Sequence, residues 1–273
     1  MTRIIDLSVT ISPMGQLKVM PDITYVSHKG FSKEFATLGG LDASDFRNGM
    51  LCGWERICMP IHQGTHLDAP WHFGCTGPDG QPAKTIEKWP LEWCYGDGVV
   101  LDFHTKERGS GITPEDLEAE LKRIGYKLKP LDIVLIRTDS TKHYNEKNYE
   151  YLGPGVTKEA TIWLIDQGIK VTGIDAFTWD KPFDCVLTQT GKQPWPTPDS
   201  LPGYDKVPPA PETGNLDEFF ESHYLGMEKE YVHAENLANL DKLTPFGFKI
   251  ALFPVKVEGG SGGWARAAAI LDD

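Results

Sequence analysis

The sequence predicts an α/β protein, and three observations carry that prediction. Short, mostly apolar runs over 98–103 and 132–137 are rich in β-branched residues, as is typical of strands buried on both faces. A helical pattern over 113–125 separates these two runs, and a second helical pattern over 157–168 precedes another strand over 170–175. A strand, a helix and a strand in this order predict a right-handed crossover between parallel strands.

Residues typical of helix ends delimit both predicted helices. Thr113 is suited to cap the first helix, and Pro114 fits the first turn, where its missing N–H is not needed. Gly125 is placed to end that helix. Thr157 and Gly168 are expected to play the same two roles in the second helix.

The remaining elements are predicted from shorter patterns. Residues 3–12 alternate in a way that favours a strand, whereas 13–50 show no clear period and are expected to be loop-rich. An apolar run over 54–61 leads directly into a group of histidines. Leucines recurring over 237–243 indicate a helix, and 248–257 is expected to form one long strand.

One stretch differs from the rest of the chain. Residues 181–215 are rich in proline and glycine but keep several aromatic side chains. A stretch this long without periodic structure is usually functional or disordered, and the aromatic content favours a packed, lid-like insertion. We therefore expect a single domain over 1–273 that carries an insertion at 181–215.

Composition excludes several classes of protein. The chain has 273 residues, of which 24% are charged and 40% hydrophobic, as in ordinary globular proteins. The net charge of −12 argues against nucleic acid or an anionic membrane as a partner. The N-terminal residues lack the apolar region of a secretory signal, which predicts a cytoplasmic protein. The five cysteines, an odd number without a CxxC pair, are expected to be reduced and buried.

The chemistry of the sequence is concentrated in residues 62–72, which read His-Gln-Gly-Thr-His-Leu-Asp-Ala-Pro-Trp-His. Three imidazoles and a carboxylate this close favour Zn²⁺, Mn²⁺ or Fe²⁺ over alkaline-earth ions. Gly64 and Pro70 oppose a helix here, so we expect a strand and a tight turn that bring His62, His66 and Asp68 to one ion.

A second, weaker signal follows much later in the chain. His223 and Glu235 are the two groups that an incomplete metal site would need for closure, or for binding a second ion. The charged residues between them are also consistent with a solvated segment. His28, His104 and His143 have no comparable neighbours, and we interpret them as ordinary surface or core histidines.

The glycine-rich run at 259–263 invites two other interpretations. It lacks the Lys-Ser/Thr ending of a phosphate-binding P-loop and the spacing of a dinucleotide-binding motif. A glycine turn that passes close to a ligand or to another strand is the better interpretation. A hydrolase that uses Ser261 as its nucleophile is the alternative, although the expected strand–turn–helix context is missing.

The pattern at 62–72 resembles the HxGTHxDxPxH motif of the metal-dependent cyclase family, which includes bacterial kynurenine formamidase and isatin hydrolase. Weaker similarity runs through 5–8, 173–175, 235–237 and the glycine-rich turn before Arg266. The resemblance implies a swivelling β/β/α fold, with a barrel-like mixed sheet flanked by helices, and assembly as a homo-oligomer.

The resemblance also implies roles for individual residues. A first metal would be bound by His62, His66 and Asp68, and His72 would be the catalytic acid/base. His223 and Glu235 would bind a second metal, with Asp68 bridging, or Glu235 would serve as a base. The cofactor is expected to be one or two ions of Zn²⁺ or Mn²⁺.

The predicted activity is hydrolysis of a carbon–nitrogen bond in a small molecule by metal-activated water. N-formylkynurenine, which would link the chain to tryptophan catabolism, or a cyclic amide is the leading candidate substrate. A lactone hydrolase or cyclase on the same site is the close alternative, and a metal-binding protein without turnover is a third.

Overall fold

The computed structural model describes four stretches of the chain, namely residues 2–13, 20–146, 149–182 and 220–271. Contacts group the chain into two compact units: a larger unit of Met1–Thr10 and Ile61–Asp273, and a smaller unit of Ile11–Pro60. The larger unit contains all the predicted site residues, from His62 to Glu235. The single-domain organisation over 1–273 stays a prediction. The predicted insertion at 181–215 lies outside the described residues, apart from its first two positions.

The larger unit is built around a nine-stranded mixed sheet, in the order β1-β13-β11-β5-β7-β9-β10-β4-β12. Its strands are β1 Arg3–Asp6, β4 His66–Asp68, β5 Tyr95–Asp102, β7 Ile133–Arg137, β9 Val171–Ile174, β10 Val232–Glu235, β11 Phe248–Ala251, β12 Gly262–Trp264 and β13 Ala268–Leu271. The central strands β5, β7, β9 and β10 are parallel, and antiparallel strands extend the sheet on both sides.

Two helices connect the parallel strands, as the sequence predicts. Helix α3 (Pro114–Ile124) lies between β5 and β7, and α4 (Lys158–Asp166) lies between β7 and β9. The side chains of Thr113 and Thr157 cap them by accepting backbone N–H groups, and Gly125 ends α3 with a left-handed φ of 69°. A short parallel pair, β6 (Gly111–Ile112) and β8 (Gly155–Val156), precedes the two helices.

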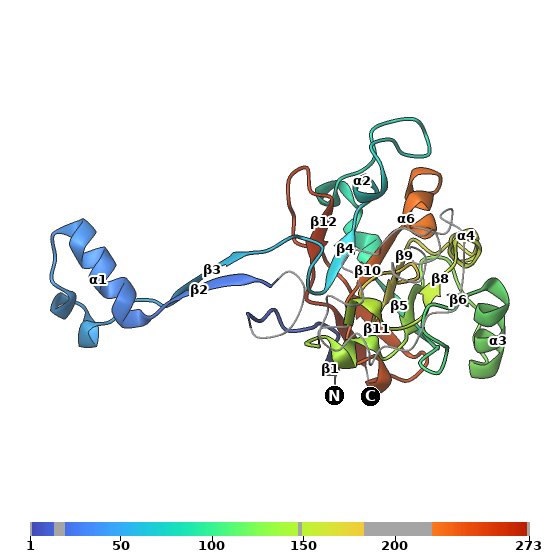
Figure 1. Ribbon diagram of the computed structural model, residues 1–273, viewed down its shortest axis with the longest axis horizontal. Coiled ribbons are helices and arrows are strands. Elements are labelled where there is room, and N and C mark those ends of the chain that lie inside the picture. The colour runs from blue at the N-terminus through green and yellow to red at the C-terminus, as the bar shows by residue number, and fades with distance from the viewer. Residues whose placement is uncertain (1, 14–19, 147–148, 183–219, 272–273) are drawn as a thin grey trace, which may run out of the picture. The chain divides into compact units, whose positions relative to one another are not determined.

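Apolar side chains cover both faces of the central sheet. Leu117 of α3 and Leu164 of α4 pack with Val99, Val134 and Ile136 on one face, and Figure 1 shows both helices on the same side of the sheet. The opposite face packs a second core, which includes Leu7, Leu67, Val100, Leu135, Val171, Ala234, Leu237, Ile250 and Ala269. Burying each large side chain of this kind stabilises the fold by roughly 1.5–3 kcal/mol.

Near the C-terminus two predicted elements are wrong. The helix expected over 237–243 is reduced to a single 3₁₀ turn at Leu240–Lys242, because Asn236 and Asn239 adopt positive φ values of 56° and 60°. The strand expected over 248–257 ends at Ala251, and beyond it Pro254 forms only an isolated bridge to Ala265.

The prediction of a loop-rich region over 13–50 is wrong, because the smaller unit contains a strand and a helix there. This unit contains an antiparallel hairpin of β2 (Asp22–Val26) and β3 (Trp54–Cys58), with α1 (His28–Gly39) between the two strands. Ser27 caps α1 through its side chain, and Gly40 ends it with φ 64°. The helix escaped prediction because Ser32 and Ala36 are its only buried side chains, so no stripe of large buried apolar residues marks one face.

Two short helices and four of the five cysteines also lie in the described residues. Helices α2 (Pro70–Phe73) and α6 (Glu221–Tyr224) each span four residues. Cys94 is buried as expected, whereas Cys52, Cys58 and Cys75 are exposed free thiols, which corrects the prediction for those three. Cys185 lies outside the described residues. None of the described helices is long and apolar enough to cross a membrane.

Candidate metal centre

The pairing of β4 with β10 builds the floor of the site. Glu235 lies opposite His66 in the antiparallel register, and two residues along the ladder, beyond the Ala234–Leu67 pair, His233 comes beside Asp68. Because side chains alternate along a strand, these four point to the same face of the sheet. Leu67, between two of them, points to the other face and is fully buried in the core. Two adjacent strands therefore present together four side chains of the types that bind metals.

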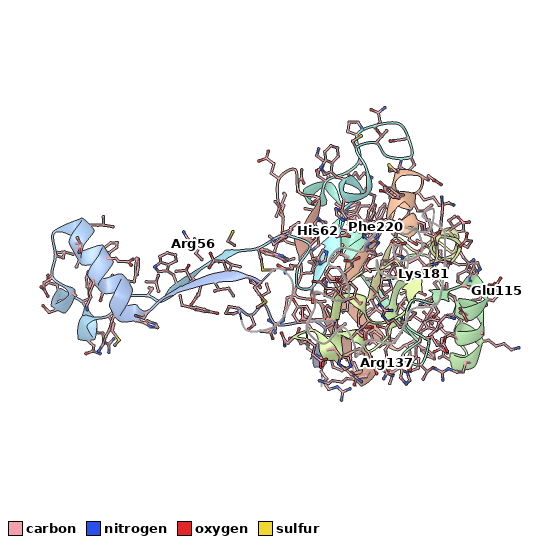
Figure 2. The ribbon with its side chains drawn as sticks, in the orientation of Figure 1. Arg56, His62, Glu115, Arg137, Lys181 and Phe220 are labelled. Atoms are coloured by element: carbon pink, nitrogen blue, oxygen red, sulfur yellow. The ribbon has the colours of Figure 1, made fainter. Side chains whose placement is uncertain are left out.

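The turn before β4 brings a further histidine to this face, as predicted. Gly64 adopts a left-handed φ of 73°, which lets the backbone curl between His62 and His66. The Thr65 hydroxyl donates to the Asn236 carbonyl (2.6 Å) and so ties the turn to the end of β10. His66 Nδ1 lies 2.9 Å from the Gly64 carbonyl, which only accepts, so Nδ1 carries the hydrogen and Nε2 is free to bind. Figure 2 labels His62, where the chain leads into β4.

His72 approaches from α2. Its ring stacks on that of His62, with centroids 3.8 Å apart, and its Nε2 lies 3.7 Å from Asp68 Oδ2. The His72 side chain is 33% exposed and that of His62 is 25% exposed, whereas the Asp68 side chain is 1% exposed. These two histidines therefore form the side of the site that solvent reaches.

His223 enters from α6, and Asp180 orients it. Asp180 accepts hydrogen bonds from the backbone N–H groups of Ser222 (2.8 Å) and His223 (3.1 Å). Its Oδ2 also lies 2.5 Å from Nδ1 of the His223 ring. A carboxylate on one ring nitrogen fixes the tautomer and directs the other nitrogen towards a metal. Sequence analysis missed Asp180, because nothing near it in the chain indicates this contact.

Asp68 divides the site into two clusters, since its two oxygens face different histidines. Oδ1 lies 2.7 Å from His62 Nδ1 and 3.1 Å from His66 Nε2. We call His62, His66, His72 and Asp68 the outer cluster; His72 is included because its ring stacks on that of His62, although its Nε2 approaches Oδ2. All four were predicted to belong to the site, and the structure brings them together.

The other oxygen of Asp68 faces the inner cluster, which consists of Asp68, His223, His233 and Glu235. Asp68 Oδ2 lies 3.5 Å from His223 Nε2 and 3.2 Å from His233 Nε2. Glu235 Oε1 lies 3.6 Å and 3.4 Å from the same two nitrogens. One ligand atom from each of the four lies within 4.8 Å of the other three.

His233 was not assigned to the site from the sequence, although a signal was present. Tyr231, His233 and Glu235 alternate with Val232 and Ala234, which is the period of a strand with one apolar face. Only the recognition of β10 as a strand places His233 on the same face as Glu235. The role of Glu235 itself was left open between ligand and base. Its burial and its position between two imidazoles favour the ligand role.

The charges of the site attract a cation. Burial opposes the charged form of His66, but the neighbouring Asp68 carboxylate outweighs it and raises the pKa of His66. Burial also opposes protonation of His223, yet Asp180 and Asp68 raise its pKa to about 10. For His72 burial prevails over the attraction of Asp68 and lowers its pKa to about 4. His72 is therefore neutral at pH 7, while the interior of the site favours positive charge.

A divalent cation fits these residues. Among the described residues, the ion-pair partners of Asp68 and Glu235 are all histidines, so no lysine or arginine of this part of the chain neutralises them. Within the same residues, His66 Nε2, Asp68 Oδ2 and both ring nitrogens of His233 are buried without a hydrogen-bond partner. Buried polar atoms of this kind are costly unless something binds them. Imidazole and carboxylate together are the ligands that Zn²⁺ and Mn²⁺ take in proteins.

Comparison with known proteins identifies the family. The family model described as "Putative cyclase" matches residues 5–181, which is more than half of the chain. The chain belongs to the cyclase family. Isatin hydrolase from Roseibium aggregatum is 26% identical over 238 residues, covering 82% of this chain and 77% of that protein. Kynurenine formamidase from Bacillus cereus is 26% identical over 120 residues, covering 44% of this chain and about half (49%) of that protein.

Solved structures confirm the predicted fold. An isatin hydrolase bound to the product analogue thioisatinate superposes with a TM-score of 0.72 at 19% identity, covering 100% of this chain and 93% of the other. A structure described as a potential metal-dependent hydrolase with cyclase activity has a TM-score of 0.62 at 18% identity and covers 100% of both chains. The cyclase-family fold, with its mixed barrel-like sheet, is therefore the fold of this protein.

In this cyclase-family chain the glycine-rich turn lies against the site. Ser261 Oγ is 2.8 Å from His62 Nε2, while Nδ1 of the same ring faces Asp68. Gly262 pairs with Asp68 across β12 and β4, and a Cβ there would come within 2.9 Å of the His62 ring. The expectation that this turn passes close to another strand is confirmed. The Ser261–His62–Asp68 chain also has the order of a serine-hydrolase triad, which keeps that alternative testable.

Proposed function

We propose that this protein is a metal-dependent hydrolase that cleaves a carbon–nitrogen bond in a small amide. The observation that carries the proposal is the two-sided arrangement around Asp68. One of its oxygens faces the partly exposed outer cluster, and the other faces the buried inner cluster. Such a carboxylate is suited to bind one ion or to be shared by two ions, with histidines as the other ligands. His62, His66 and Asp68 would hold the outer ion, and His223, Glu235 and Asp68 the inner one.

A bound divalent ion would supply a Lewis acid that polarises the scissile carbonyl and makes water a stronger nucleophile near neutral pH. The chain supplies the proton transfers. His72 is neutral at pH 7 and partly exposed, so its free ring nitrogen accepts a proton from the attacking water and returns it to the leaving nitrogen. Stacking on His62 fixes the plane of the His72 ring during both transfers.

The proposed substrates follow from the relatives. Their names describe one enzyme that hydrolyses isatin, a cyclic amide, and another that acts on an arylformamide. We therefore propose an arylformamide such as N-formylkynurenine, or a cyclic amide, acted on by Zn²⁺ or Mn²⁺. A homo-oligomer, a small-molecule substrate and a cytoplasmic location remain part of the proposal.

The test is to offer the metal-loaded protein a formanilide, an isatin-like lactam and a lactone. Hydrolysis of an amide, lost on chelation and restored by Zn²⁺ or Mn²⁺, is the expected result. Turnover of the lactone alone would favour the lactone hydrolase. No turnover of any of the three would contradict the hydrolase and leave a metal-binding protein.

The serine alternative is decided by Ser261→Ala. If Ser261 only orients His62 through Nε2, its loss should weaken metal binding or activity by ~10–100-fold, and excess metal should restore part of the rate. If Ser261 is the nucleophile, the variant should be inactive at every metal concentration, and the wild-type protein should withstand a chelator.

A further inference from the structure

His233 sets the inner cluster apart from the outer one. Its side chain is fully buried, and its ring is surrounded by aromatic residues. Trp179 stacks on it at 5.6 Å, with Phe73 at 5.2 Å and Tyr231 at 5.7 Å between ring centroids. A histidine that served only to fill this apolar space would leave both ring nitrogens without partners among the described residues. An apolar residue would fill the same space without that cost.

The distances within the inner cluster match the ligand shell of one ion. Four ligands at ~2.0–2.2 Å around a tetrahedral ion lie roughly 3.3–3.6 Å from one another. The His223 and His233 Nε2 atoms lie 3.5 and 3.2 Å from Asp68 Oδ2, and 3.6 and 3.4 Å from Glu235 Oε1. Hydrogen bonds would draw these atoms closer together, whereas a shared ion requires this spacing.

Neighbouring groups hold the inner ligands in place. The backbone N–H of Trp179 donates to Glu235 Oε1 (2.9 Å), and Asp180 binds the far nitrogen of His223. His233 and Glu235 share one rigid strand, and Asp68 lies on the strand beside it. Three of the four atoms are therefore preorganised by a β-ladder, and the fourth, on His223 of α6, is held by Asp180.

We propose that His233 is the fourth protein ligand of the inner ion, and that it closes this ion to solvent. Sites with four protein ligands are typically structural, whereas catalytic sites keep a position open for water. The inner ion would then stabilise the fold and exchange slowly, while the ion of the outer cluster would exchange readily past the partly exposed His62 and His72. This inference rests on the proposed function only in requiring that the clusters bind divalent ions.

The test compares ion loss from the wild type, His233→Leu and a control, Tyr231→Phe. Leucine fills the space of the imidazole without offering a ligand. The control alters a neighbouring buried ring whose hydroxyl donates to the Ser222 carbonyl, and it leaves the ligands unchanged. Each protein is loaded with Zn²⁺ and placed in excess chelator, and the zinc bound per chain is followed with time.

The wild type and Tyr231→Phe should lose one ion quickly and a second slowly. In His233→Leu the slow phase should disappear or become ~10-fold or more faster, with a lower melting temperature in zinc. An unchanged slow phase in His233→Leu would overturn the role of His233 while leaving the hydrolase proposal intact. A wild-type protein that binds zinc but loses all of it quickly would also overturn the role of His233 and leave the hydrolase proposal intact. A wild type that binds no zinc or manganese would overturn both proposals.

A measurement on the wild type decides the question if His233→Leu does not fold. Co²⁺ loaded into the slowly exchanging site should give the intense visible absorption of a four-coordinate ion. Only the weak absorption of a six-coordinate, hydrated ion would contradict a site closed by four protein ligands.

Discussion

The inner and outer clusters use the same kinds of ligand but differ in how they are built. The inner cluster takes three of its four ligands from the β4–β10 ladder, and all four are almost completely buried. The outer cluster takes His62 from a turn and His72 from a four-residue helix, and both reach solvent. One carboxylate, Asp68, therefore belongs both to a buried cluster built on a β-ladder and to a cluster that solvent reaches.

The largest expected effect comes from removing the residue that both clusters share. Asp68→Ala should lose bound metal at both clusters and reduce kcat/KM by ~10³-fold or more, because the remaining buried histidines lose their common carboxylate. Metal analysis and steady-state kinetics measure the two losses. Asp97→Ala is the matched control, since Asp97 is an exposed carboxylate paired with Lys129 and Lys249. Retention of both ions by Asp68→Ala would show that the clusters do not share it.

A change confined to the outer cluster should separate chemistry from metal binding. His72→Asn should reduce kcat by ~10²–10⁴-fold, because the proton acceptor is lost, while the ion content and melting temperature stay unchanged. His104→Asn, at an exposed histidine paired with Asp102, is the control. Loss of an ion from His72→Asn would instead make His72 a metal ligand, as its place near Asp68 also permits.

A change behind the inner cluster should have a moderate effect. Asp180→Asn removes the charge that holds His223 Nδ1, so the affinity for the slowly exchanging ion should fall by ~10–100-fold. Titration with a metal-competing dye gives the affinity. Asp166→Asn, at an exposed carboxylate paired with Lys229, should leave it unchanged. An equal loss in both variants would contradict an orienting role for Asp180.

The smallest expected effect concerns Asp139, a carboxylate outside the site that is paired with Arg137 and Lys142. Burial disfavours the charged form of Asp139, but hydrogen bonds from Arg137 and Lys142 outweigh it and lower its pKa to about 2. A folded-state pKa below the unfolded value makes Asp139 stabilising above pH 4, and this contribution is lost as the pH falls from about 4 to about 2. Chemical denaturation at several pH values should show that the free energy of unfolding falls less steeply between pH 4 and pH 2 in Asp139→Asn than in the wild type. The same dependence of this free energy on pH in both proteins would contradict a stabilising role for the Asp139 charge.

The outer cluster was predictable from the sequence because its residues are neighbours in the chain. His62, His66, Asp68 and His72 fall within eleven residues, and Gly64 marks the turn that brings them together. Helices α3 and α4 were predictable for a similar reason, since threonine caps and apolar periods are local signals.

The inner cluster was only partly predictable because its geometry depends on strand pairing across more than 160 residues. His223 and Glu235 were identified, but His233 becomes a site residue only when β10 pairs with β4. Asp180 is found only by its contact with His223. The smaller unit was missed because β3 is exposed along its whole length, so no alternation marks it as a strand.

Anomalous diffraction from crystals grown with Zn²⁺ or Mn²⁺ tests the central claim most directly. Data collected on both sides of the metal absorption edge should show a strong peak bounded by His62, His66 and Asp68, and a second bounded by the four inner ligands. A protein that turns over its substrate with no peak beside Asp68 would contradict the account.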